Sequence, residues 1–159
     1  MSSPLDLAAG SQAIGRGFNR WSYTRMFLRS MKPKALRKLA QHPGLFDGTR
    51  LRLARDLYQF DDIFTAPVHG FRDADDYYAR ASAKPWLHRI RIPALVLNAL
   101  NDPFVPEDSL PRQSEVGPHV TLWQPRHGGH VGFAGGRLPP GNAMAMPTSV
   151  VAWLKDHNR

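Results

Sequence analysis

The sequence predicts an α/β fold: a helical region, then two parallel strands, then a closing helix. Apolar residues recur at helical spacing in the first half of the chain, as at Trp21, Leu28 and Met31. Residues 94–97 form an unbroken apolar run, which is typical of a strand buried on both faces of a parallel sheet. A second β-branched and aromatic run follows at residues 120–124, after a connection long enough for a crossover.

The composition is that of a globular protein with one core. The chain has 159 residues, of which 42% are hydrophobic, and it has no cysteine. Disulfides, thiolate metal sites and a cysteine nucleophile are therefore excluded. The first ten residues carry no Lys or Arg, and no apolar run approaches the ~18 residues needed to span a bilayer. We therefore expect a cytoplasmic protein.

The net positive charge of the chain comes entirely from its N-terminal part. The net charge is +8; residues 1–60 hold 11 Lys/Arg against 3 Asp/Glu, whereas residues 61–159 hold 10 of each. Such a patch can attract phosphates, an anionic membrane surface or acidic substrates. A solvated helical face is the simpler interpretation. No nucleic acid partner is expected, and weak membrane-surface contact through the basic helices of residues 16–55 stays open.

Residues 1–90 are expected to form a strand stub and a helical cap region. Ser3 has the side chain of a helix N-cap and Pro4 suits the first helical position, so a helical turn should begin there. Farther along, Pro33 should end one helix and begin the next, because its ring disrupts a helix interior. Proline and glycine at residues 43–44 should stop this second helix.

Shorter helices should complete the cap region. Leucine spacing predicts one between residues 51 and 57, and residues 60–67 should form a loop or a short helix. Residues 73–82 should form another, because acids at its start suit the helix dipole. Trp86 and Leu87 should pack the end of this helix against the core. Several helices in a row without a strand are typical of a lid over a sheet.

Residues 91–159 should contain the C-terminal strands, the loops that follow them and a closing helix. A crossover helix is expected at residues 109–116, and the glycine- and proline-rich residues 135–141 should form a loop. The closing helix is expected at residues 148–157. It should bury its apolar side chains, which are Val150, Val151 and Leu154.

Each strand is followed by a loop that carries a candidate catalytic side chain. Asp102 follows the first strand, and His130 lies in the glycine-containing loop after the second. Open α/β sheets bind ligands beyond the carboxyl ends of their strands. An acid after one strand and a histidine after the next form the second half of the Ser…Asp…His order of α/β-hydrolases.

Spacing alone leaves alternatives open. An acid between asparagine and proline is common turn chemistry, so Asp102 could be an ordinary turn residue. His127 competes with His130 as the base, and the two histidines could bind a metal together with Asp102. The two intervening glycines make a loose spacer, however, so no metal and no other cofactor is expected.

Several segments resemble the YheT-type α/β-hydrolases, which are relatives of the mammalian abhydrolase-domain lipases and the yeast medium-chain ethyl ester synthases. The matching segments are residues 2–7, 60–71, 75–78, 98–104 and 127–133. The resemblance covers nearly the whole chain. It implies that the chain is the C-terminal part of an α/β-hydrolase fold. It also implies that Asp102 is the triad acid, that His130 is the triad base, and that the chemistry acts on medium- or long-chain acyl esters.

The sequence departs from this family at the nucleophile. No serine has glycine two residues away on both sides, and Ser11, which comes nearest, fails this spacing. We therefore expect a truncated or split hydrolase that keeps the acid and base but lacks the nucleophile, with a missing N-terminal half as its partner. The alternative is a non-catalytic module that binds an acyl ligand or regulates another protein.

Overall fold

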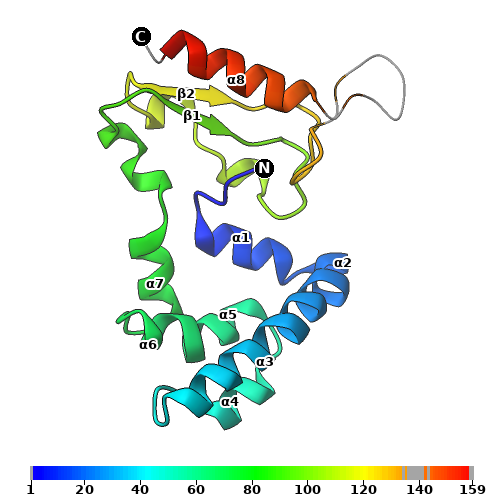
Figure 1. The fold of residues 1–159 in the computed structure, drawn as a ribbon, viewed down its shortest axis with the longest axis vertical. Coiled ribbons are helices and arrows are strands. Elements are labelled where there is room, and N and C mark those ends of the chain that lie inside the picture. Colours follow the sequence, from blue (N-terminus) through cyan, green and yellow to red (C-terminus); the bar gives the residue numbers. More distant parts are fainter. Residues whose placement is uncertain (1, 134, 136–141, 143, 158–159) are drawn as a thin grey trace. The chain divides into compact units, whose positions relative to one another are not determined.

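The computed structural model describes residues 2–133, 135, 142 and 144–157. The chain divides into two compact units (Figure 1). The strand unit comprises Met1–Leu5 with Ala83–Arg159, and the helical unit comprises Asp6–Ser82. In sequence, the helical unit is thus inserted between two segments of the strand unit. In the strand unit, the Lys84 N–H donates to the Leu5 carbonyl over 3.0 Å; in the helical unit, the Leu7 N–H donates to Ser82 Oγ over 3.0 Å.

The helical unit contains no strand among its residues, all of which are described. Its elements in order are α1 (Leu7–Ile14), α2 (Gly17–Asn19), the π-helical turn η1 (Arg20–Thr24), α3 (Arg25–Gln41), α4 (Gly48–Leu53), α5 (Leu57–Phe60), the π-helical turn η2 (Asp61–Thr65), α6 (Ala66–Val68) and α7 (Ala74–Ala81). The helix predicted at residues 73–82 is confirmed as α7. The helix predicted between residues 51 and 57 is wrong, because α4 ends at Leu53 and α5 begins at Leu57.

Aspartate side chains start four of these helices. Asp6, Asp47, Asp56 and Asp73 each precede a helix and accept a backbone N–H from its first turn, which satisfies a donor that the helix cannot pair internally. The N-cap predicted at Ser3 is therefore wrong. The Asp6 carboxylate accepts the Ala9 N–H over 3.0 Å, so α1 begins after Asp6.

The long helix α3 runs through Pro33, contrary to the break predicted there. Proline removes one backbone donor from a helix and its ring crowds the preceding turn. Leu28 and Ala35 lie on either side of Pro33 and are both buried in one hydrophobic cluster. Burial on both sides keeps the helix continuous despite the missing hydrogen bond.

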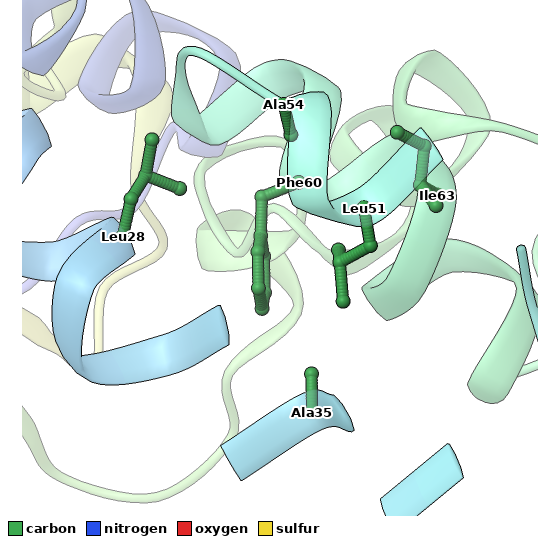
Figure 2. Packing of buried hydrophobic residues seen from close by; sticks show 6 residues of the cluster. All are labelled: Leu28, Ala35, Leu51, Ala54, Phe60 and Ile63. Atoms are coloured by element: carbon green, nitrogen blue, oxygen red, sulfur yellow. The ribbon is translucent and has the colours of Figure 1, made fainter. Parts of the chain in front are cut away.

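That cluster is the core of the helical unit. Its buried members come from α3, α4, the loop after α4, α5 and η2, and they are Leu28, Ala35, Leu51, Ala54, Phe60 and Ile63. Figure 2 shows the Phe60 ring lying between Leu28 and Leu51, with Ala35 facing it from α3. Phe64 packs against this cluster and meets Phe46 edge to face, with ring centroids 4.9 Å apart.

The strand unit is built on a two-stranded parallel sheet. Strand β1 (Ala94–Leu97) pairs with β2 (Val120–Trp123), with Ala94 opposite Val120 and Leu97 opposite Trp123. Leu5, Leu87, Val96 and Val120 form its buried cluster. The parallel pairing is confirmed, but the rest of β1 is only half-buried. Among the described residues, no strand pairs with its other edge.

The connection between the strands contains no α-helix, so the helix predicted at residues 109–116 is wrong. It holds two 3₁₀ turns, η4 (Glu107–Ser109) and η5 (Gln113–Glu115). Leu110 has extended backbone angles, φ −68° and ψ 148°, because a residue before proline is pushed out of the helical region. Pro111 therefore separates the two turns.

The predicted burial of Trp86 is wrong, and so is the predicted burial of the apolar side chains of the closing helix. In the 3₁₀ helix η3 (Lys84–Arg89), Leu87 is buried but Trp86 is 46% exposed, with the Arg89 guanidinium over its ring at 4.4 Å. The closing helix α8 (Ala145–His157) runs alongside β2 (Figure 1). It presents Trp153 to the sheet, where Nε1 donates to Thr121 Oγ1 over 3.4 Å.

The face of α8 that was expected to be buried is largely open. Val151 is 48% exposed and Leu154 is 51% exposed, while Val150 is half-buried. Most of the loop expected at residues 135–141 lies outside the described residues; Gly135 itself pairs with Asn142 in an isolated bridge. None of the described helices is both long enough and apolar enough to cross a membrane.

Candidate active site

Asp102 and His130 lie together where the two strands end. The Asp102 Oδ2 atom is 2.9 Å from His130 Nδ1, which is hydrogen-bonding distance. The Asp102 side chain is fully buried, whereas that of His130 keeps 28% of its surface exposed. The acid is therefore shielded from solvent, while the imidazole remains accessible from one side.

The local turn after β1 fixes the orientation of the acid. Asp102 Oδ1 accepts the Phe104 N–H over 2.8 Å, so the carboxylate uses one oxygen for its own loop and the other for the histidine. An aspartate that bonds the backbone two residues ahead is favoured before proline-containing turns. The turn chemistry that competed with the catalytic interpretation thus coexists with the contact to His130.

Asn101 ties the acid loop to the histidine loop, and the sequence analysis missed it. Its Oδ1 accepts the N–H groups of Gly128 and Gly129 over 3.0 and 2.9 Å. One side-chain oxygen next to Asp102 therefore holds the backbone just before His130. Its place beside the acid was visible in the sequence, but nothing there identified the two distant amides that it binds.

The glycines of this loop allow close packing that a larger residue would prevent. A Cβ on Gly128 would lie 2.6 Å from Phe133 Cδ1 and 2.9 Å from Ala99 Cβ, closer than such atoms approach. Gly129 has φ +55°, where residues with a Cβ are strained. Phe133 is buried at φ 44°, and its N–H donates to the Gly128 carbonyl over 2.8 Å. The histidine loop is thus a tight turn closed by a buried ring.

Ser2 also holds the histidine loop through hydrogen bonds, and the sequence analysis did not identify it. Its N–H donates to the His130 carbonyl over 2.9 Å, and its Oγ accepts the Ala99 N–H over 3.1 Å. The residue is 1% exposed. A buried serine with both polar groups engaged by the backbone serves to hold the loop.

Curated proteins similar to this chain are named as esterases and lipases. YheT of Escherichia coli (strain K12), named as an esterase, is 41% identical over 140 residues, which are 87% of this chain and 41% of that protein. Phospholipase ABHD3 of Homo sapiens is 38% identical over 136 residues, covering 82% of this chain and 32% of that protein. Monoacylglycerol lipase ABHD2 of Homo sapiens is 32% identical over 139 residues, covering 76% of this chain and 33% of that protein. No family model and no solved structure matches the sequence.

The chain belongs to the YheT-type α/β-hydrolase family. It spans about two fifths of the length of YheT and about a third of the length of the two lipases. The helices and the two-stranded parallel sheet are accordingly part of an α/β-hydrolase fold.

His127, the competing base, is exposed and does not make the contact to Asp102. Within the described part of the chain, no three side chains of the metal-binding types converge on a common point. Of the two histidines in this loop of the YheT-type chain, His130 is therefore the one positioned against a carboxylate.

Ser11, the serine nearest to a glycine-flanked spacing, lies in α1 of the helical unit. Its Oγ is 3.0 Å from the Tyr78 hydroxyl, which donates to Asp61 Oδ2 over 2.7 Å. Burial raises the pKa of the Asp61 carboxyl, and it also raises the pKa of the Tyr78 hydroxyl well above its ordinary range. No histidine takes part in these contacts, so Ser11 lacks the base that would activate it.

The geometry of the pair suits acid–base chemistry. When Nδ1 carries the proton it donates to the Asp102 carboxylate, so the Nε2 atom, on the other side of the ring, keeps its lone pair. The buried carboxylate then stabilises the imidazolium that forms when Nε2 accepts a proton. The Phe104 ring meets the imidazole edge to face, with centroids 4.9 Å apart, and restricts its rotation.

Proposed function

We propose that this chain supplies the acid and the base of a serine-type carboxylic ester hydrolase or acyltransferase. His130 would be the general base and Asp102 the residue that orients it. The observation that carries the proposal is the 2.9 Å contact between a fully buried carboxylate and a partly exposed imidazole at the strand ends. The residues of this chain would correspond to the C-terminal part of the family fold, with the helices of residues 6–82 as the cap region.

The proposed roles follow the chemistry of the triad. His130 Nε2 takes the proton of an attacking serine hydroxyl and later delivers it to the leaving alcohol. Asp102 holds the ring in the tautomer that allows this exchange. The serine and the donors that stabilise the oxyanion would come from a Gly-x-Ser-x-Gly segment, which the 159 residues do not contain.

The names of the relatives narrow the substrate class. They are called an esterase, a phospholipase and a monoacylglycerol lipase, and these names favour lipid esters as the substrate class. We propose medium- or long-chain acyl esters for this chain, with the serine of the N-terminal segment lying between His130 Nε2 and the acyl carbonyl that it attacks.

The test compares the 159-residue chain alone with the chain mixed with the N-terminal segment of a YheT-type relative. The chain alone should give neither ester turnover nor labelling by a fluorophosphonate probe, because a base without a nucleophile has no proton to take. The mixture should give both. His130→Ala should reduce the restored activity by orders of magnitude, and Asp102→Asn should reduce it substantially because the ring loses its orienting acceptor.

His127→Ala is the matched control, since it removes an exposed histidine from the same loop. Equal losses from the two histidine variants would refute the proposed roles. Strong probe labelling of the chain alone would show that one of its own serines acts as the nucleophile. Saturable binding of a fatty acyl ester without turnover in the mixture would favour the non-catalytic module.

A further inference from the structure

A cationic cleft lies beside α3 in the helical unit. It has a volume of about 730 Å³, and four of its lining residues are Arg25, Arg29, Lys32 and Arg55. None of the residues that line it is acidic. An anion in this cleft would meet positive charge from both α3 and the segment between α4 and α5.

The charges of this cleft are not neutralised internally. In the described part of the chain, none of the four cations forms an ion pair with a carboxylate. Residues 16–55 contain 11 Lys/Arg and a single acid, Asp47, whose carboxylate caps α4. The Lys32 ammonium is anchored by donating to the Arg52 and Ala54 carbonyls, and partial burial lowers its pKa. The cleft therefore carries a positive field that an external anion can satisfy.

Large apolar side chains are exposed on the same helical segment. Phe18 is 72% exposed and Trp21 is 67% exposed, and their ring centroids lie 6.1 Å apart. They precede Arg25 and Arg29 on one continuous helical segment, which runs from α2 through η1 into α3. Met26, which lines the cleft, is 54% exposed. Exposed aromatic rings and arginines on the same helical segment are typical of helices that lie in a membrane interface.

We propose that this surface, formed by Phe18, Trp21 and the cationic cleft, binds an anionic phospholipid membrane. The cleft would receive phosphate head groups, and the two rings would enter the boundary between head groups and acyl chains. A lipid surface fits better than a nucleic acid, because Met26 in the cleft wall has no ring to stack on a base but gains from contact with hydrocarbon. The proposal does not depend on the nucleophile or on the roles of Asp102 and His130.

The test measures sedimentation of the 159-residue chain with vesicles of pure phosphatidylcholine and with vesicles that contain about a third phosphatidylglycerol. Binding should be confined to the anionic vesicles and should weaken as salt is added. Arg25→Gln combined with Arg29→Gln should lower the partition constant about 25-fold, since each cation near an anionic surface contributes about fivefold. Trp21→Ala should also lower it.

Matched controls remove the same number of arginines, or one tryptophan, from positions outside the proposed surface. Arg72→Gln with Arg80→Gln removes two exposed cations of the helical unit that are paired with Asp73 and Asp76, and it should leave the partition constant nearly unchanged. Trp86→Ala, which removes a partly exposed ring from η3, should do the same. Circular dichroism of each variant checks that the helices persist.

Several results would overturn the proposal. Equal binding to both kinds of vesicle would remove the role of the anionic head group. Equal losses from the two double variants would show that only net charge matters. Displacement by inorganic phosphate at the concentration of the lipid phosphate would identify a site for free phosphate. Tighter binding of an RNA oligonucleotide with the same dependence on Trp21 would identify a nucleic acid surface instead.

Discussion

Replacing Leu51 by alanine should strongly destabilise the helical unit. Leu51 lies in α4 with none of its surface exposed, in the cluster that contains Phe60 and Ile63. The substitution removes three carbon groups, each worth about 0.8 kcal/mol of burial, and leaves a cavity that adds to this loss. We expect the free energy of unfolding to fall by about 3–4 kcal/mol.

Leu53→Ala in the same helix is the matched control. Leu53 is 72% exposed, so the identical chemical change should alter the free energy of unfolding by less than about 0.5 kcal/mol. Urea unfolding followed by far-ultraviolet circular dichroism measures both variants, because the helices dominate that signal. Similar losses from the two variants would refute the assignment of Leu51 to a packed core. So would a loss below about 1 kcal/mol from Leu51→Ala.

Two further substitutions test the packing of the histidine loop at Gly128 and the raised pKa of Asp61 in the helical unit. Gly128→Ala should lower the free energy of unfolding by about 1–3 kcal/mol, because its Cβ would collide with Phe133 and Ala99; an unchanged free energy of unfolding in urea would show that the loop can relax. Burial raises the pKa of Asp61, so its ionisation opposes folding, and its contribution to stability should fall as the pH rises from below its ordinary value to above its raised one. Asp61→Asn should remove that part of the pH dependence, so the difference in unfolding free energy between wild type and variant should change as the pH rises from below 3.8 through the raised pKa; a constant difference would contradict the raised pKa.

Local patterns in the sequence were enough to predict the elements that bear the candidate site. The apolar run at β1 and the β-branched run at β2 fixed both strands and their parallel pairing. The loops after them contain Asp102 and His130, and parallel strands end at the same edge of a sheet. Strand order therefore predicted that an acid and a histidine would lie close together, whereas the choice of His130 over His127 came from the family resemblance.

The rest could not be predicted because it depends on contacts between distant residues. Pro33 has the local signature of a helix end, but burial on both sides of it keeps α3 intact. The side chains that hold the histidine loop, Asn101 and Ser2, act on backbone groups far along the chain. The closing helix α8 has apolar residues on more than one side, so its periodicity did not identify which side meets β2.

The chain leaves the strand unit after Leu5 and rejoins it at Ala83, and the next N–H, of Lys84, donates to the Leu5 carbonyl. The helical unit likewise joins its own two ends through Leu7 and Ser82. A segment whose ends are adjacent can be lengthened, shortened or exchanged with little effect on the fold that carries it. Mutation can therefore reshape residues 6–82 while the strand ends that hold Asp102 and His130 stay constant. The length and sequence of the helical unit can thus evolve at their own pace, separately from the two loops that hold the acid and the histidine.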